Sequence, residues 1–340
     1  MGTVSVLTGT LQTYAWGRVN AMNTWLPTAA DGPHAELWFG AHPNGPSMVV
    51  NGPHMNAESA PLLVKLLAAG SPLSIQVHPD AAGVRLLQSE SETAGLLADC
   101  AVKAEALIAL ESFAVLAGLR SAAEAHRILS AGFPASSRAL TALEQGERIS
   151  AIREIFEQHE PFDAQAALNA LPANERTVME SVVATYAGDS GLPVAFMMHA
   201  RVLQPGQAMF VNASCLHAYV NGFGVEVMTS SDNVLRLGLT PKQVALEPAL
   251  SILNPDLQPD IVSITDATLS IPGFPFSVQR VTHGLVLVQQ PGTIVLCVTG
   301  SAQADCGAAV STGQAAFLHH GECSWQVDGE IYIARPTGDN

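Results

Sequence analysis

The segment LSIQVH, residues 73–78, constrains the fold more than any other stretch of the chain. Its polar residues Ser74, Gln76 and His78 alternate with apolar residues, and this period of two places the three polar side chains on one face of a β-strand. The inner surface of a β-barrel is normally apolar, so a polar inner face would mark a site. The reverse orientation, with the polar face in solvent, fits the isolated strand equally well.

The composition suits a large folded chain and disfavours several classes of partner. Of the 340 residues, 48% are hydrophobic and 13% are charged, so the chain can bury a large core. The formal net charge of −15 argues against nucleic acid or an anionic membrane surface as the main partner. No apolar run reaches the ~18 residues of a membrane span, and the first residues do not form a signal peptide. We expect a cytoplasmic monomer that binds a small molecule.

The cysteines indicate a reduced protein. There are five, odd in number, widely spaced and free of any CxxC motif: Cys100, Cys215, Cys297, Cys306 and Cys323. This usage is typical of reduced thiols in a cytosolic protein and not of a disulfide framework.

The chain divides into four segments by its pattern of residues. Short apolar strands broken by Gly, Pro and Asn fill residues 1–120, and the same pattern returns at 190–255. Between them, residues 121–189 are rich in Ala, Leu, Glu and Arg, with apolar residues at helical spacing. Residues 256–340 contain further strand candidates and no helical pattern. We predict a mainly β fold: a discontinuous barrel from the first two segments, a helical insertion and a smaller C-terminal β domain.

A second segment offers a carboxylate to the polar strand. In KAEALIAL, residues 103–110, Lys103 and Glu105 share one face of a strand that continues as an apolar run. A lysine and a glutamate two residues apart are most often a solvent-exposed pair. A solvent-exposed pair is therefore the better interpretation of this segment unless another part of the chain supplies further metal ligands.

The partner lies further along, in GQAMFVNASCLHAYVN. This segment resembles the second motif of the cupins, a glycine followed after five residues by Pro-x-Gly-x-x-His-x-x-x-Asn. Gly206, His217 and Asn221 fall at the family spacings, whereas Asn212 and Ser214 replace the usual proline and glycine. In cupins this histidine binds a metal together with ligands on an earlier strand. Outside that context, a single histidine after an apolar strand is most often a hydrogen-bonded core residue.

The candidate ligands together suit one zinc ion per chain. Two neutral imidazoles, one carboxylate and one amide oxygen are suitable donors for Zn²⁺, and they leave coordination positions for water or substrate. With a single carboxylate, the ion and its ligands keep a formal charge of about +1, which preserves Lewis acidity. The predicted ligands are Gln76, His78, Glu105 and His217.

Over nearly its whole length the chain resembles the type I mannose-6-phosphate isomerases (phosphomannose isomerases) of the cupin superfamily. The matching stretches are YAWG at 14–17, AELWFGAHP at 35–43, LSIQVHPD at 73–80, HAY at 217–219, VE at 225–226 and SDNVLRLGLTPK at 231–242. The resemblance implies cupin (jelly-roll) barrels with an inserted α-helical domain, and zinc on the four predicted ligands. It also implies a cytoplasmic isomerase of carbohydrate metabolism that interconverts mannose 6-phosphate and fructose 6-phosphate, in mannose catabolism or in GDP-mannose supply.

The resemblance gives positions to all the lysines of the chain. Twelve of the fifteen basic residues are arginines, and lysine occurs only at Lys65, Lys103 and Lys242. Each matches a lysine that the family carries at the active site, although a solvated surface is the usual place for lysine. Lys65 and Lys242 are expected to bind the anionic part of the substrate, with Ser74 as a hydrogen-bonding neighbour. Arg236 is the family's usual catalytic candidate.

The implied reaction moves a proton between C2 and C1 of an open-chain sugar through an enediolate. A zinc ion near O1 and O2 would stabilise its negative charge, and a base must move the proton. Asp232 and Glu226 are the base candidates, with Tyr219 and Lys103 as possible proton donors. The alternative role for Asp232 is that of a turn residue. A metal-assisted hydride shift would use the same site.

One departure and two alternatives remain. The family usually has Asn-His-Lys-Pro-Glu at the glutamate ligand, whereas this chain has AVKAE, so Val102 replaces a histidine whose role cannot be carried over. The first alternative is another cupin metalloenzyme, such as an epimerase or dioxygenase; the glutamine ligand, Arg236 and Lys242 disfavour it. The second is a non-catalytic sugar-phosphate sensor, which would be expected to lose a ligand or a catalytic residue.

Overall fold

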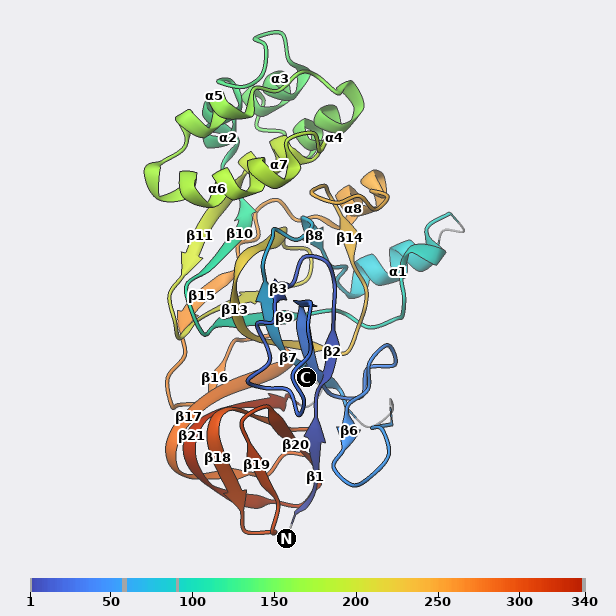
Figure 1. Cartoon of the computed structure of the whole chain (residues 1–340). Coiled ribbons are helices and arrows are strands. Elements are labelled where there is room, and N and C mark those ends of the chain that lie inside the picture. Colours follow the sequence, from blue (N-terminus) through green and yellow to red (C-terminus); the bar gives the residue numbers. More distant parts are fainter. Residues whose placement is uncertain (1, 57–59, 90–91, 338–340) are drawn as a thin grey trace.

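The computed structural model describes residues 2–56, 60–89 and 92–337. Its fold is mainly β, as predicted from the sequence, and it has three parts arranged along one direction (Figure 1). A group of helices lies at one end, a large sheet lies in the centre, and the C-terminal strands lie at the other end. None of the helices in the described residues has the length and apolar composition that a membrane crossing requires.

The central sheet has eleven strands within the described residues, and strand β13 is its hub. β13 forms antiparallel pairs with β7, β8, β9 and β10, so strands from distant parts of the sequence meet along one long strand. The strands of this sheet are β2 (Thr10–Gln12), β5 (Glu36–Phe39), β7 (Leu62–Ala69), β8 (Gln76–Val77), β9 (Glu105–Ala109), β10 (Phe113–Leu119), β11 (Met198–Leu203), β12 (Gln207–Val211), β13 (His217–Thr229), β14 (Leu235–Arg236) and β15 (Asp260–Ser263).

The C-terminal sheet takes in the first strand of the chain. β1 (Thr3–Thr8) pairs with β20 and with β6 (Met48–Val49), whereas the sequence pattern groups residues 1–120 with the first barrel. Apolar alternation predicts that a strand has a buried face but not which sheet it joins. The other strands of this sheet are β16 (Leu269–Ser270), β17 (Phe276–Val288), β18 (Ile294–Ala304), β19 (Ala309–Ser311), β20 (Gln314–His320) and β21 (Cys323–Pro336); β3 (Arg18–Val19) and β4 (Pro33–His34) form a separate pair.

Six of the helices follow one another between residues 122 and 196. The first begins with a capping box, in which the Ser121 side chain accepts from the Glu124 backbone and the Glu124 side chain accepts from the Ser121 backbone. Helices α1 and α8 and the short 3₁₀ helix η2 lie outside this run, at positions where the sequence pattern indicates strands and loops. The helices are α1 (Ala81–Ser89), η2 (Ala94–Leu96), α2 (Ala122–Leu129), α3 (Arg138–Glu144), α4 (Arg148–Gln158), α5 (Ala164–Ala170), α6 (Ala173–Tyr186), α7 (Leu192–Phe196) and α8 (Leu246–Ile252).

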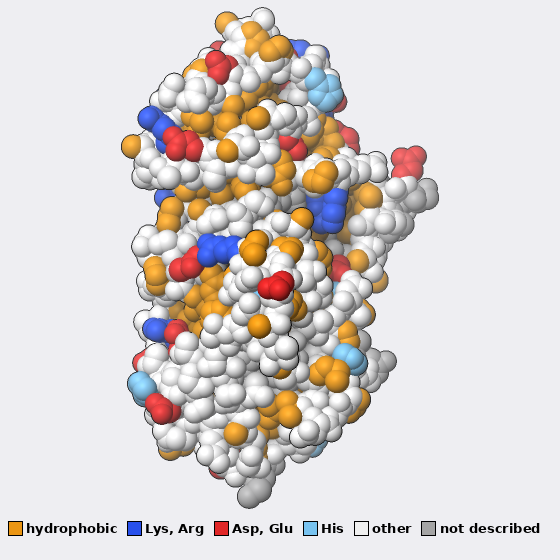
Figure 2. Space-filling model, viewed as in Figure 1, with side chains coloured by type: hydrophobic (Ala, Val, Ile, Leu, Met, Phe, Trp, Pro, Cys, Tyr) orange, Lys and Arg blue, Asp and Glu red, His pale blue; other side chains and the backbone are white. Residues whose placement is uncertain are grey.

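The two sheets are joined by a shared apolar core. Phe39 and Leu66 of the central sheet belong to the same buried cluster as Phe276, Phe317 and Tyr332 of the C-terminal sheet. Burial of such large side chains is the main force that holds two layers together. On the face shown in Figure 2, charged side chains are few, and some of them lie beside a side chain of opposite sign, as expected when only 13% of residues are charged.

A buried ion pair connects the helices to the central sheet. The guanidinium of Arg120, directly after β10, donates to both carboxylate oxygens of Glu175 in α6; its Nη1 lies 3.3 Å from Oε1. Arg120 Nε also donates to the carbonyl oxygen of Phe196 at 3.2 Å, and the Ala200 backbone donates to Glu175 Oε2 at 3.1 Å. Arg120 is 3% exposed, so removal of its partner would leave a buried charge without compensation.

We therefore expect the substitution Glu175→Ala to lower the free energy of unfolding by about 3 kcal/mol. Urea unfolding measures this loss. Glu180→Ala, on the exposed face of the same helix, is the matched control and should change stability by less than about 0.5 kcal/mol. Equal stability of the two variants would show that the pair does not connect the helices to the sheet.

Candidate active site

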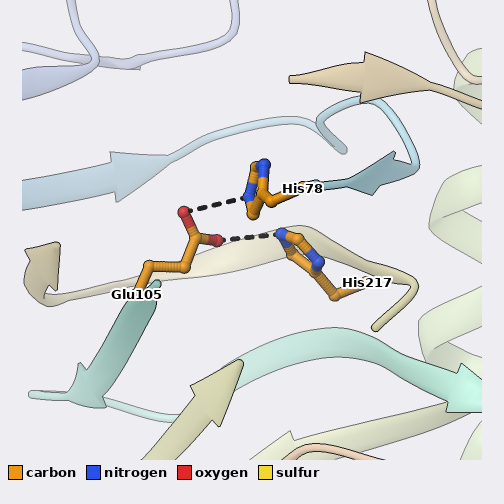
Figure 3. A group of neighbouring side chains, drawn as sticks. All are labelled: His78, Glu105 and His217. Atoms are coloured by element: carbon orange, nitrogen blue, oxygen red, sulfur yellow. Dashed lines mark ion pairs between the residues drawn. The ribbon is translucent and has the colours of Figure 1, made fainter. Parts of the chain in front are cut away.

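Three predicted metal ligands converge from three strands. His78 follows β8, Glu105 begins β9 and His217 begins β13. Figure 3 shows the carboxylate of Glu105 facing both imidazoles, with Oε1 2.8 Å from His217 Nε2 and Oε2 3.4 Å from His78 Nε2. All three side chains are at most 3% exposed, and one ligand atom from each lies within 4.8 Å of the others. The group could hold one metal ion.

The hydrogen bonds of the histidines turn their free nitrogens towards Glu105. Nδ1 of His78 lies 2.8 Å from the carbonyl oxygen of Asn233, and Nδ1 of His217 lies 3.1 Å from that of Cys215. Because a carbonyl oxygen only accepts, we assign a proton to Nδ1 of each ring, so Nε2 is the nitrogen that faces Glu105 and could bind a metal.

The chemistry of this donor set fits a cation. Burial lowers the pKa of His78 to about 4, so its ring is neutral near pH 7. Its Nε2 has no hydrogen-bond partner among the described residues. Burial alone would raise the pKa of Glu105, but Lys103 and the two histidines hold it well below its usual range. Two imidazole nitrogens and a carboxylate oxygen so close together form the donor set of a metal site, and the unpartnered Nε2 of His78 is the atom that an ion would contact.

The fourth predicted ligand lies beside this group. Gln76 in β8 is paired with His217 in β13, and its Nε2 donates to Ser74 Oγ at 3.2 Å. Since the amide nitrogen is occupied, the amide oxygen is the atom left to bind a metal. The role of Gln76 stays a prediction.

A cavity of about 540 Å³ opens next to the metal group. It is lined by every predicted site residue except the fully buried His78: Lys65, Ser74, Gln76, Lys103, Glu105, His217, Tyr219, Glu226, Asp232, Arg236 and Lys242. A second cavity of about 630 Å³ brings together only one charged side chain, that of Arg201. Chemistry therefore favours the cavity beside the metal group. Val102, which replaces the family's histidine, is 36% exposed and does not line that cavity.

Lys65 lies in the cavity in contact with two carboxylates. Its Nζ is 2.8 Å from Glu226 Oε2 and 3.4 Å from Glu36 Oε1, and it lies 5.2 Å from the centre of the Trp38 ring. Burial alone would lower the pKa of Lys65, but the two carboxylates raise it, so the ammonium stays charged. Its charge is already balanced by protein groups.

Arg236 and Lys242 present the opposite situation. Arg236 lies in β14, paired with Gln76, and is half-buried, whereas Lys242 is exposed. Across the described residues, neither side-chain cation has a hydrogen bond or ion pair with another protein group. Two unpaired positive charges at one cavity of an acidic protein form a site for an anion.

Two further site residues hold Glu105. Tyr219 Oη donates to Glu105 Oε1 at 3.1 Å, and Lys103 Nζ lies 3.1 Å from Oε2. Burial raises the pKa of Tyr219 well above its usual range and also raises that of Glu226. Tyr219 and Lys103 therefore position the carboxylate that faces the two histidines.

Asp232 is held at the edge of the cavity through one of its oxygens. Its Oδ2 lies 2.9 Å from Asn44 Nδ2, which donates to it, and 3.3 Å from His42 Nε2. The Asn44 backbone donates to His42 Nδ1, so we assign the ring proton of His42 to Nε2, facing the carboxylate. The hydrogen bond from His42 lowers the pKa of Asp232, and Oδ1 has no partner among the described residues.

The sequence analysis did not single out Asn233. Its side chain anchors the turn that carries Asp232, and its own carbonyl oxygen is the hydrogen-bond partner of His78. Its Oδ1 accepts from the backbones of Ala98 and Asp99, and its Nδ2 donates to Asp99 Oδ1 and to the Ala101 carbonyl oxygen. Asn233 is fully buried. In the sequence, only its position within SDNVLRLGLTPK indicated a role for Asn233, because its hydrogen-bond partners lie more than 130 residues earlier, at 98–101.

Comparisons with known proteins agree with the resemblance. The model of the family "Phosphomannose isomerase type I, catalytic domain" matches residues 4–60 and 53–122. Mannose-6-phosphate isomerase of Escherichia coli K12 is 28% identical over 97% of this chain and 98% of its own length. The enzyme of Bos taurus is 27% identical over 86% of this chain and 87% of its own length.

Solved structures show the same fold. A variant of phosphomannose isomerase from Salmonella typhimurium matches with a TM-score of 0.83 and 24% identity, over 98% of this chain and 99% of that one. A zinc-bound mannose 6-phosphate isomerase matches with a TM-score of 0.80, at the same identity and coverage. The predicted class, mainly β cupin barrels with helices, is confirmed.

We expect Asn233→Ala to weaken divalent-metal binding by about 10-fold or more, because the turn that holds the His78 imidazole loses its anchor. Competition with a chromogenic chelator at pH 7.5 measures the dissociation constant. Asn169→Ala, on an exposed helix position, is the matched control. Unchanged metal affinity in a folded Asn233 variant would exclude this positioning role.

Proposed function

Because this chain belongs to the type I phosphomannose isomerase family, we propose that it is a zinc-dependent aldose–ketose isomerase that interconverts mannose 6-phosphate and fructose 6-phosphate. One observation carries the proposal: a buried cluster of metal donors lies beside the cavity that two unpaired cations line. The isomerisation of a phosphorylated sugar needs a metal ion beside the sugar oxygens and positive charge beside the phosphate. The similar proteins of Escherichia coli and Bos taurus are mannose-6-phosphate isomerases, which supports the same assignment.

In this proposal His78, Glu105 and His217, together with Gln76, hold one zinc ion per chain. Zinc would supply a Lewis acid that stabilises negative charge on substrate oxygens. The unpartnered Nε2 of His78 supports a bound ion, and the zinc in a similar solved structure supports the choice of ion. A glutamine ligand is neutral, so the site keeps a positive formal charge.

The cations Arg236 and Lys242 bind the anionic part of the substrate, with Ser74 as a neutral donor. A phosphate ester carries a charge of about −1.5 to −2 near pH 7, and a chain with net charge −15 repels it except where cations gather. Lys65 is assigned a different task from that expected on the sequence alone. Because Glu226 and Glu36 already contact its ammonium, Lys65 supplies the positive partner of two buried carboxylates beside the reaction site.

Proton transfer between C2 and C1 is assigned to Asp232. Its carboxylate stays ionised because His42 and Asn44 donate to Oδ2, and Oδ1 is free to accept a carbon-bound proton. Glu226 is the weaker of the two base candidates because Lys65 contacts Oε2. The hydroxyl of Tyr219 and the ammonium of Lys103 both contact Glu105. These two residues therefore act on the substrate indirectly, by positioning that carboxylate.

The first test is turnover. We expect the purified protein to convert mannose 6-phosphate to fructose 6-phosphate in a coupled assay, to lose activity with a strong chelator and to regain it with added zinc. Deuterium at C2 should exchange with solvent protons during turnover, as an enediolate route requires. Full retention of deuterium in the product would indicate a hydride shift. Binding of the sugar phosphate without turnover in the zinc-loaded protein would favour the sensor.

The second test is Arg236→Ala, which we expect to lower kcat/KM by about 100-fold or more. If Arg236 binds phosphate, KM rises and the preference for mannose 6-phosphate over mannose falls; if it acts on the enediolate, kcat falls at constant KM. Arg201→Ala removes an exposed arginine from outside the cavity and is the matched control. Equal kinetics of the two variants would refute a role for Arg236.

A further inference from the structure

The C-terminal sheet contains a close pair of thiols away from the cavity. Cys306 lies in the turn between β18 and β19, and Cys323 begins β21. Their Sγ atoms lie 2.9 Å apart, and the neighbouring Asp305 backbone donates to the Ser324 carbonyl oxygen at 3.0 Å. The backbone thus fixes the two cysteines side by side. No disulfide joins any of the five cysteines in this structure.

The two thiols differ in access to solvent. Cys306 is partly exposed, whereas Cys323 is fully buried. Gly2 covers Cys323 so closely that a Cβ added to Gly2 would lie 2.5 Å from its Sγ. Burial raises the pKa of the Cys323 thiol to about 11, which disfavours its thiolate. A small oxidant from solvent therefore meets Cys306 first.

A metal site is the competing use of the same atoms. Asp305, Cys306 and Cys323 are close enough together to hold an ion. Two thiolates on one tetrahedral zinc ion would lie ~3.8 Å apart, whereas these sulfur atoms are in direct contact at 2.9 Å. Asp305 is exposed and the group offers three donors, fewer than the four of a structural zinc site. The geometry favours chemistry between the two sulfurs.

We propose that Cys306 and Cys323 are a reversible oxidation site that closes to a disulfide when the protein meets hydrogen peroxide. The Cys306 thiol gives up its proton, the thiolate attacks one peroxide oxygen and the O–O bond breaks; the leaving hydroxide takes up that proton, so a sulfenic acid and one water form. The Cys323 sulfur then attacks the sulfenic sulfur; the S–S bond forms, the S–O bond breaks, and the Cys323 proton leaves with the hydroxyl as a second water. Both sulfurs are oxidised by one electron each and the peroxide is reduced to two waters.

The cross-link would connect the two ends of a segment that contains β19 and β20. β20 pairs with β1, so the link encloses the strand on which the N-terminal residues dock. A disulfide that closes a loop of about 17 residues restricts the unfolded chain and stabilises the folded one. Neither cysteine lines the cavity beside the metal group, so the proposal is independent of the proposed function.

The experiment treats the full-length protein with hydrogen peroxide at neutral pH. We expect titratable thiols in denaturant to fall from five to three, since one disulfide consumes two. Peptide mass mapping should identify a Cys306–Cys323 cross-link that has lost two hydrogens. Tm should rise by about 5 °C, and dithiothreitol should reverse both changes.

Variants decide the assignment. Cys306→Ser and Cys323→Ser should each prevent the cross-link and the rise in Tm, whereas Cys100→Ser, which removes an exposed cysteine elsewhere, should prevent neither. If Cys323→Ser fails to fold, Cys306→Ser alone still tests whether the cross-link and the rise in Tm require this pair of cysteines. Five remaining thiols after peroxide, a different cross-linked pair, or oxidation of Cys306 without a cross-link would overturn the proposal. So would a second zinc ion in the wild type that Cys306→Ser loses.

Discussion

The antiparallel pairing of β13 is the constraint on which the rest of the structure depends. His217 lies opposite Gln76, Glu226 opposite Lys65, and Met228 opposite Glu105, so one strand aligns the residues of three others. A slip of one residue would turn these side chains to the other face of the sheet and separate the imidazole from the carboxylate. The metal group therefore exists because the sheet has this register, and the apolar core on the opposite face stabilises the register.

The site also solves a problem of charge. Several carboxylates are buried in a chain of net charge −15, which is stable only if each has a positive or hydrogen-bonding partner. Lys65 serves Glu226 and Glu36, while Lys103 and Tyr219 serve Glu105. In the proposed function, zinc completes this balance. Two cations without partners, Arg236 and Lys242, are then left for the anion of the substrate.

A second layer of residues makes the site one unit. The turn that Asn233 anchors presents Asp232 to the cavity and, through its carbonyl oxygen, orients His78. The proposed base and a proposed ligand thus depend on the same hydrogen bonds to Asp99. The C-terminal sheet is connected to this unit through the shared apolar core, while its thiol pair responds to a different chemistry.

Local pattern alone determined the mainly β class, the presence of a helical segment and the types of the candidate ligands, because periodicity and residue chemistry are properties of short segments. The cupin architecture was implied by the family resemblance. Local pattern could not decide whether the face of Ser74, Gln76 and His78 points into the barrel, since a strand with alternating polar and apolar residues can turn either face inward. Tertiary structure decided that. It also decided that Lys65 is already paired while Lys242 is not, that Asn233 anchors the turn, and that β1 joins the C-terminal strands. Each of these depends on partners more than a dozen residues away, and pairing at such distance is set by the packing of the whole chain.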